Sequence, residues 1–161
     1  MKHIDADNNV LGSVLRSEIR QRQLWHRCTY IIIENSSDQY LIQRRTLTKD
    51  YCPGYFDLTT GGVVGGDEDE DEGAVRELEE EMGIKDVKLE KLPVIKFEPG
   101  QVWAYVYRLT NFEGVLTLQE SEVAGVEKWT KEEILAKIES GEKITPDSIH
   151  VFRELLKQNL I

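Results

Sequence analysis

Three glutamates near the middle of the chain, Glu77, Glu80 and Glu81, have the spacing of side chains on one face of a helix. They fall near the C-terminal end of a helix predicted for residues 69–82, where the helix dipole disfavours anions. Like charges ~5 Å apart in a partly buried site repel by roughly 3 kcal/mol. A divalent cation converts this repulsion into ligation, and carboxylate oxygens suit Mg²⁺ or Mn²⁺. The pattern therefore predicts a metal site, with a solvated acidic helix face as the alternative.

Most of the net negative charge of the chain lies in this segment. The chain has 161 residues, of which 30 are acidic and 20 are basic, for a net charge of −10. Residues 67–81 contain ten acidic residues and one basic residue, Arg76, so this stretch carries −9 and the rest carries −1. General binding of nucleic-acid backbones is disfavoured, because it requires a basic surface.

Length and composition favour a single folded domain over residues 1–161. The longest strongly apolar run, residues 30–33, is far too short to span a membrane. The first residues show no apolar stretch of the kind found in secretion signals. The two cysteines, Cys28 and Cys52, form no motif and are interpreted as reduced thiols. We therefore expect a cytoplasmic protein that does not associate with membranes.

The predicted helix has both a buried stripe and a defined end. Its apolar residues Ala74, Val75, Leu78 and Met82 recur at helical spacing and are expected to face the core. Gly83 suits the left-handed position that ends a helix, after which the chain can fold back on Leu78. Acidic residues in the first turn are favoured by the helix dipole and need no functional explanation.

The remaining elements predict a mostly antiparallel or mixed sheet with helices packed on it. Strands are expected at 28–34 and 39–46, paired as a hairpin, with an edge strand in 9–15 and a short strand at 56–60. Two longer strands, 87–97 and 101–110, precede a strand at 125–129. Helices are expected from Thr130, which begins a capping box, and from Thr145, which precedes a proline. Residues 16–25 are expected to be helical or irregular.

The acidic segment also carries a longer motif, Gly62-x5-Glu68-x7-Arg76-Glu77-Leu78-x-Glu80-Glu81-x-Gly83-Ile84. It resembles the Nudix box at every constrained position. Residues 26–31, 43–49, 53–57 and 119–123 are similar to a YfcD-like bacterial subgroup of Nudix hydrolases, which is related to isopentenyl-diphosphate isomerase. The resemblance implies a Nudix-type α/β/α sandwich around a mixed β-sheet, in which the box (residues 62–84) forms a loop, a helix and a loop.

The resemblance also implies roles for individual residues. Glu77, Glu80, Glu81 and the carbonyl of Gly61 would ligate Mg²⁺ or Mn²⁺. Arg76 would hold Glu77 by a charge-assisted hydrogen bond, and Glu68 would support charge balance or folding of the box. Either Glu120 or Glu122 would be a further ligand or the general base, and Glu77 stays an alternative base.

Three cations are candidates for contact with the phosphates of a substrate: Arg44, Arg45 and Lys49. On a strand, Arg44 and Arg45 point to opposite faces, so at most one of them is expected to face the site directly. The alternative for each is an ordinary surface cation.

The implied activity is Mg²⁺-dependent hydrolysis of a diphosphate bond in a nucleoside diphosphate linked to another moiety, or in a related organic pyrophosphate. One alternative is isopentenyl-diphosphate isomerase. That family needs a reactive cysteine and a metal-binding histidine just after residues 53–57, and residues 57–63 contain neither. A non-catalytic ligand-binding module on the same scaffold is the other alternative. The expected partner is a small-molecule diphosphate, and a homodimer is suggested by the resemblance alone.

Overall fold

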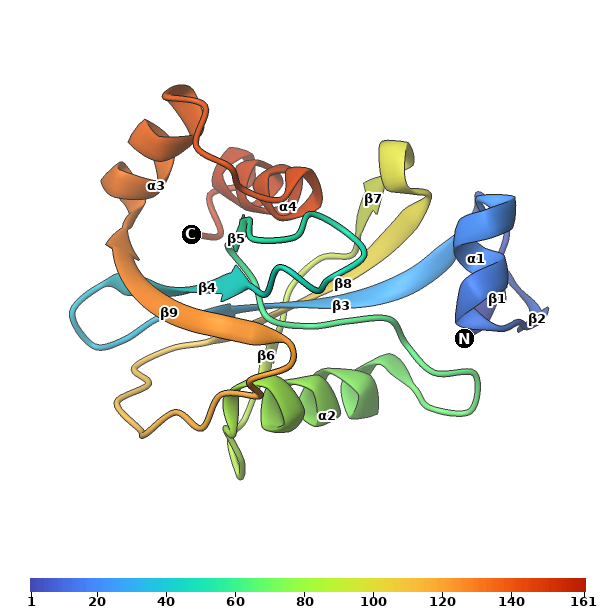
Figure 1. The fold of residues 1–161 in the computed structure, drawn as a ribbon, viewed down its shortest axis with the longest axis horizontal. Coiled ribbons are helices and arrows are strands. Elements are labelled where there is room, and N and C mark those ends of the chain that lie inside the picture. Colours follow the sequence, from blue (N-terminus) through green and yellow to red (C-terminus); the bar gives the residue numbers. More distant parts are fainter.

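The computed structural model describes residues 1–161 as two β-sheets with helices on both sides (Figure 1). The first sheet has the order β2 (Val10–Ser13), β1 (Lys2–Ile4), β3 (His26–Ile33), β8 (Val102–Leu109) and β6 (Glu90–Lys91), and β7 (Ile95–Phe97) also pairs with β8. The second sheet has the order β5 (Phe56–Asp57), β4 (Gln39–Arg45) and β9 (Val123–Thr130). The helices are α1 (Arg16–Arg22), α2 (Glu70–Met82), α3 (Lys131–Glu139) and α4 (Pro146–Lys157), with a 3₁₀ turn at Glu98–Gly100.

The first sheet is mixed, because β3 and β8 run parallel over eight residue pairs while its other pairings are antiparallel. The predicted α/β/α architecture around a mixed sheet is therefore confirmed. In Figure 1, α2 lies below the strands and α4 lies above them.

Strand β3 is buried on both faces, and this fixes the layers. Ile31 and Ile33 pack with the apolar residues of α2, whereas Tyr30 and Ile32 belong to the cluster that includes α4. Alternate side chains of a strand point to opposite faces, so one strand supplies both cores. Helix α2 is consequently held against the middle of the molecule.

The predicted hairpin of residues 28–34 and 39–46 is wrong. The two strands share only a bridge between Glu34 and Tyr40. Strand β3 instead pairs with β8, and β4 pairs with β5 and β9. Asn35 does form the expected turn, since its side-chain oxygen accepts from the backbone N–H groups of Ser37 and Gln39. Local turn chemistry was therefore predicted correctly, but β4 finds a longer partner in β9 and leaves the first sheet.

The single strand predicted for residues 87–97 is also wrong in extent, because it is divided into β6 and β7 around Pro93. Proline has no N–H for a strand ladder, which explains the interruption. The strand expected at 56–60 is shortened to β5, and Thr60 makes an isolated bridge to Ile31. Strand β2 lies at a sheet edge as expected.

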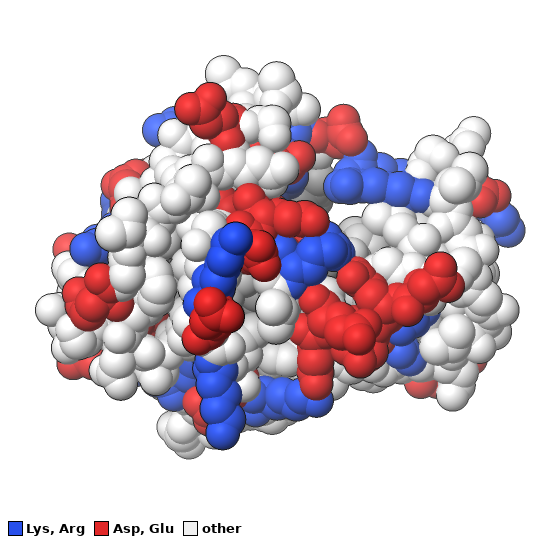
Figure 2. Space-filling view, turned by 90° about the horizontal axis from the view of Figure 1, so that it is seen from below, with Lys and Arg blue, Asp and Glu red and all other residues white.

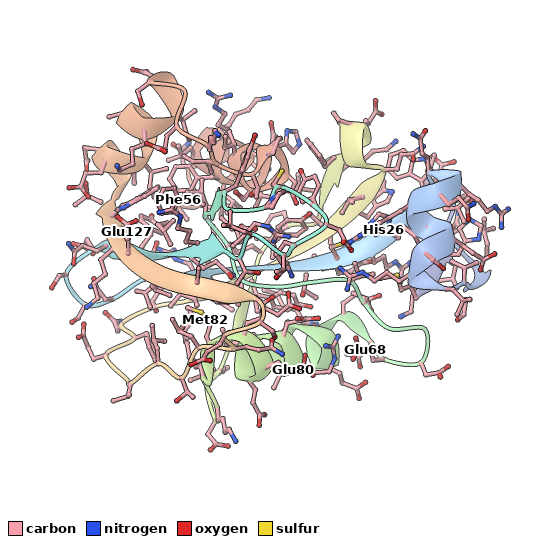
Figure 3. The ribbon with its side chains drawn as sticks, viewed as in Figure 1. His26, Phe56, Glu68, Glu80, Met82 and Glu127 are labelled. Carbon is pink, nitrogen blue, oxygen red and sulfur yellow. The ribbon has the colours of Figure 1, made fainter.

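Helix α2 begins and ends as its sequence predicts. Asp69 and Glu72 form a capping box, and Gly83 ends the helix with φ of 68°. Ala74, Leu78 and Met82 are buried, and Met82 lies between α2 and the strands (Figure 3). Val75 is 49% exposed, so its assignment to the buried stripe is wrong. The buried face is turned toward Glu81 instead, which gives that carboxylate its unusual position.

No helix combines the length and the apolar character needed to cross a membrane.

Leu78→Ala should lower the free energy of unfolding by about 2–5 kcal/mol, because it leaves a cavity at a fully buried position between α2 and β3. Val75→Ala, one turn earlier on the same helix, should change it by less than ~1 kcal/mol. Urea unfolding of both variants measures the difference. Equal losses would contradict the orientation of α2 described here.

Candidate active site

The three glutamates at the end of α2 differ in depth. The side chain of Glu80 is 49% exposed and that of Glu77 is 15% exposed, while Glu81 as a residue is 7% exposed. With about 100° of rotation per helical residue, Glu81 stands nearest to the buried Leu78, Glu77 stands further round the helix, and Glu80 is the most remote. The shared helix face predicted from the sequence is therefore a graded one, running from the core to solvent.

Arg76 is the cation that holds this acidic group together. Its Nε and Nη2 atoms donate to the two oxygens of Glu68 at 2.9 and 2.7 Å, a two-point contact. Its Nη1 donates to Glu77 at 2.9 Å and to Glu80 at 3.1 Å. One guanidinium thus orients three carboxylates, and the contacts with Glu68 lower the pKa of that residue. Figure 2 shows the acidic side chains gathered in a patch on the face that carries α2.

Glu68 also joins the start of the box to the helix. Its Oε1 accepts from the backbone N–H of Gly65 at 2.7 Å. In Figure 3, Glu68 and Glu80 mark the two ends of the segment that Arg76 spans. The role in box folding that the resemblance implies for Glu68 is consistent with these contacts.

The loop at Gly61 and Gly62 lies against the carboxylate of Glu77. A Cβ atom on Gly62 would come within 2.5 Å of Glu77 Oε1, and one on Gly61 would come within 2.0 Å of the Thr29 carbonyl oxygen. The carbonyls of Thr60 and Gly62 accept hydrogen bonds from Ile31 and Thr29 of β3, whereas the Gly61 carbonyl between them accepts none. An unpaired carbonyl beside the partly buried carboxylate of Glu77 is an available oxygen ligand.

Burial raises the pKa of both inner glutamates. The pKa of Glu81 rises from its ordinary value of 4.5 to about 7, mainly because the side chain is withdrawn from water. Gln43 Nε2 donates to Glu81 Oε2 at 3.1 Å and opposes part of this rise, while the nearby charge of Glu77 adds to it. Burial also raises the pKa of Glu77, against the lowering effect of Arg76. Glu77 is paired with Arg76, whereas Glu81 has no ion-pair partner within the protein.

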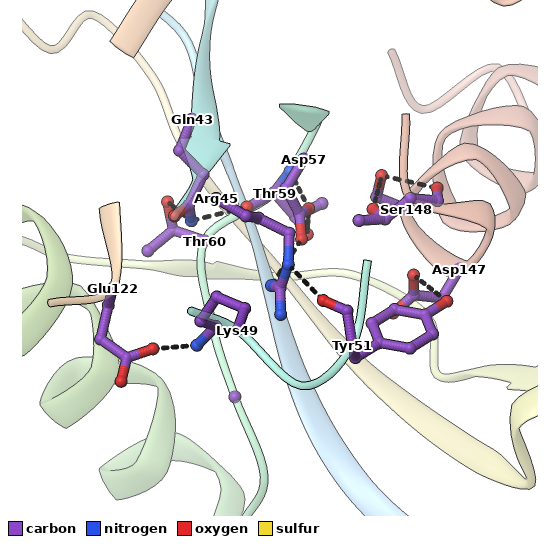
Figure 4. Close-up of polar contacts among 12 residues, drawn as sticks. Gln43, Arg45, Lys49, Tyr51, Asp57, Thr59, Thr60, Glu122, Asp147 and Ser148 are labelled. Atoms are coloured by element: carbon purple, nitrogen blue, oxygen red, sulfur yellow. Dashed lines mark hydrogen bonds and ion pairs between the residues drawn. The ribbon is translucent and has the colours of Figure 1, made fainter. Parts of the chain in front are cut away.

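A second group of polar residues comes from β4, from the segment after it, from β5 and from the residue before β9 (Figure 4). Lys49 forms an ion pair with Glu122, and its charge acts on Glu81. Arg45 donates through Nε to the Tyr51 carbonyl at 3.0 Å and lies 3.6 Å from the carboxylate of Asp57. Lys49 is thus a candidate phosphate contact whose charge reaches Glu81 and lowers its pKa.

Two of the candidate residues, Arg44 and Glu120, lie away from this group of polar residues. Arg44 is exposed and sits over the ring of Phe56, 5.2 Å from its centroid, on the opposite side of β4 from Arg45. Glu120 is exposed and makes no ion pair, whereas Glu122 is joined to Lys49. The structure therefore brings Glu77, Glu81, Gly61, Lys49 and Glu122 together, and leaves Arg44 and Glu120 outside.

Asp57 and Asp147 form a polar pair near Arg45 that no sequence motif predicted. Burial and the neighbouring charge of Asp147 raise the pKa of Asp57. Asp147 accepts from the hydroxyls of Tyr30 at 2.8 Å and Tyr51 at 3.2 Å. Asp57 was visible in the stretch Pro53-Gly54-x2-Asp57, but Asp147 comes from the first turn of α4, and nothing in the sequence joins the two.

The oxygen atoms at this site fit a hard divalent cation by type, because they belong to the buried carboxylate of Glu81, the partly buried carboxylate of Glu77 and the unpaired carbonyl of Gly61. As the side chains stand, no three acidic, histidine or cysteine residues converge closely enough to hold a metal ion. Arg76 Nη1 lies between Glu77 and Glu80 and contacts both carboxylates.

Comparison with known proteins agrees with this geometry. Residues 24–152 match the NUDIX domain family. The Nudix hydrolase YfcD of Shigella flexneri is 39% identical over 158 residues, which cover 97% of this chain and 86% of that protein. YfcD of Escherichia coli strain K12 is 38% identical over the same shares of the two chains.

Solved structures give the same fold. The crystal structure of DR0079 from Deinococcus radiodurans has a TM-score of 0.85 at 26% identity and covers 96% of this chain and 97% of that one. The NUDIX domain of NrtR from Shewanella oneidensis, solved with ADP ribose, has a TM-score of 0.65 at 14% identity and covers 92% of this chain and all of that one, 100%. At that identity the second likeness concerns the fold alone.

The chain therefore belongs to the Nudix family and is a Nudix pyrophosphohydrolase. Within the family it is YfcD-like.

The raised pKa of Glu81 predicts how the stability of the metal-free protein depends on pH. The folded state holds a proton that the unfolded chain releases above pH 4.5, so this residue makes stability fall as pH rises from about 4.5 to about 7. The full effect is on the order of 3 kcal/mol. Glu81→Gln should thus be more stable than the wild type at pH 8 and similar to it at pH 4.

Glu80→Gln is the matched control, because this half-exposed side chain should contribute less than ~1 kcal/mol at either pH. Urea unfolding in a chelator at both pH values measures the difference between each variant and the wild type. An equal gain from the two variants would show that general relief of acidic charge, rather than the burial of Glu81, controls stability.

Proposed function

We propose that this protein hydrolyses, with Mg²⁺ or Mn²⁺, a diphosphate bond in a nucleoside diphosphate linked to another moiety or in a related organic pyrophosphate. The observation that carries the proposal is the buried carboxylate of Glu81 one turn from the partly buried carboxylate of Glu77, beside the unpaired carbonyl of Gly61. Two such anions are unfavourable in a metal-free protein. A divalent cation would make the same arrangement favourable.

The residues proposed to hold the metal are Glu77, Glu80, Glu81 and the carbonyl of Gly61. Once bound, a divalent cation neutralises phosphate oxygens and lowers the pKa of bound water. Glu80 would need to leave Arg76, which its half-exposed side chain can do by rotation. Arg76 would still be anchored by its two contacts with Glu68, and would keep Glu77 in place.

Lys49 and Glu122 are proposed to act on the substrate side of the site. Lys49 offers a point charge to a phosphate oxygen. An incoming phosphate would compete with Glu122 for this cation and so free the Glu122 carboxylate. A general base must reach the proton that it removes. We prefer Glu122 to Glu120 as the base, because Glu122 lies beside Lys49 whereas Glu120 is exposed and has no ion-pair partner.

The two alternatives receive less support. An isomerase of isopentenyl diphosphate would need a reactive thiol at the site, but burial raises the pKa of both Cys28 and Cys52 and so favours the unreactive thiol form. A non-catalytic module would have no need for the full set of box carboxylates, of which Glu81 is buried at a cost in stability. The ADP ribose bound by the NrtR domain is a member of the proposed substrate class, and it belongs in the first panel of compounds tested.

The proposal is tested by incubating the protein with a panel of nucleoside diphosphates linked to sugars, nucleosides or other groups, with Mg²⁺ or Mn²⁺, and measuring phosphate after phosphatase treatment. Glu77→Gln and Glu81→Gln should each lower kcat/KM by about 10²–10⁴-fold. Glu79→Gln is the matched control on the same helix, because Glu79 is exposed and pairs with Lys85 at 3.0 Å. Full activity in the first two variants would reject the proposed site.

The choice of base is tested separately. Glu122→Gln should lower kcat by at least about 10²-fold, because its amide cannot accept the proton. Glu120→Gln should stay within about twofold of the wild type, since Glu120 is exposed and unpaired. A loss confined to Glu120→Gln would assign the base to that residue. If neither variant loses activity, Glu77 becomes the base.

A further inference from the structure

Gln43 is a buried polar residue to which the proposed chemistry assigns no role. It is 4% exposed and lies on β4, the central strand of the second sheet. Its backbone neighbours are Asp57 on β5 and Val126 on β9, so the strand is held on both sides. Leu41, two residues earlier, packs with the apolar residues of α2, and Gln43 points to the same side.

The side-chain amide of Gln43 joins three segments. Its Nε2 atom lies 3.0 Å from the Thr59 carbonyl oxygen, 3.2 Å from Thr60 Oγ1 and 3.1 Å from Glu81 Oε2 (Figure 4 shows the contacts with the threonines). A backbone carbonyl and a carboxylate accept hydrogen bonds only, so the nitrogen of the amide must face them. The orientation of Gln43 is thus set by its partners.

Gln43 is also the only hydrogen-bond donor to the carboxylate of Glu81. The other two glutamates of the group share the guanidinium of Arg76. A guanidinium would cancel much of the charge of the carboxylate that it holds. A neutral amide fixes the position of a carboxylate and leaves its negative charge available to a cation.

We propose that Gln43 is a positioning residue, which orients the Glu81 carboxylate toward the loop of Gly61 so that it can ligate a divalent cation. The proposal rests on the metal site proposed above. The same amide holds Thr59 and Thr60, the residues that lead into Gly61. These contacts hold the amide in place, and Gln43 acts on the metal site through its hydrogen bond to Glu81.

The experiment measures Mn²⁺ binding without substrate, by the electron paramagnetic resonance signal of free Mn²⁺. Gln43→Met keeps nearly the same volume and removes the donor, and it should weaken Mn²⁺ binding about 10–100-fold. Gln43→Asn keeps a buried amide that is too short to reach Glu81, so it should show a similar loss if the methionine variant fails to fold. Circular dichroism and thermal unfolding report the fold of each variant.

Two further variants separate positioning from general support of the fold. Thr60→Val removes one partner of Gln43 without touching Glu81, and should bind Mn²⁺ within about twofold of the wild type. In a Glu81→Gln background, Gln43→Met should have almost no further effect, because the ligand through which it acts has lost its charge. An equal loss in Thr60→Val, or an undiminished loss in the double variant, would overturn the proposal.

The wild type distinguishes this inference from the proposed function. If the wild-type protein binds no Mn²⁺ and releases no phosphate from any pyrophosphate, the proposed function fails and the role of Gln43 fails with it. If the wild type binds Mn²⁺ and folded Gln43→Met and Gln43→Asn bind it equally well, only the inference about Gln43 is overturned.

Discussion

The burial of negative charge at the end of α2 is the constraint on which the site depends. Glu81 lies beside the buried face of the helix, and Glu77 lies against the glycine loop. Burial raises the pKa of both groups, which means that the fold holds them in a state that water would not favour. Such an arrangement persists only because the strands, the loop and the helix are fixed independently by their apolar contacts.

Those apolar contacts come from both faces of β3. Its alternate isoleucines pack on α2, and the residues between them pack on the α4 side. A helix anchored in this way cannot turn to release Glu81 to solvent without also exposing Leu78 and Met82. The stability of the core and the strain at the site are therefore linked through one helix.

The carboxylates of the site are held by two kinds of hydrogen-bond donor, the charged Arg76 and the neutral Gln43. Arg76 gathers the outer carboxylates and ties them to Glu68, and so organises the box before any ligand arrives. Gln43, on the second sheet, contacts Glu81, which is the innermost carboxylate. A full ion pair at the innermost position would satisfy the buried charge within the protein and leave little for a cation.

The sequence by itself determined the family motif and the limits of α2, because each is encoded by local spacing, and the resemblance of the motif to the Nudix box implied the mixed sheet. Asp69 caps the start of the helix and Gly83 caps its end through contacts within a few residues, and the box fits one continuous pattern. The pairing of β4 depended on partners more than seventy residues apart, so the predicted hairpin was wrong. For the same reason, Gln43 meets Glu81, and Asp57 meets Asp147, only in the folded chain.

Tertiary structure alone also decided which side chains of an apparently uniform motif are buried. Helical spacing placed Glu77, Glu80 and Glu81 together and Val75 in the core. It did not define the rotation of the helix about its own axis. Packing against β3 fixed that rotation, with Val75 outside and Glu81 inside. Local periodicity encodes which residues share a face, whereas contacts with distant strands select the depth at which each one lies.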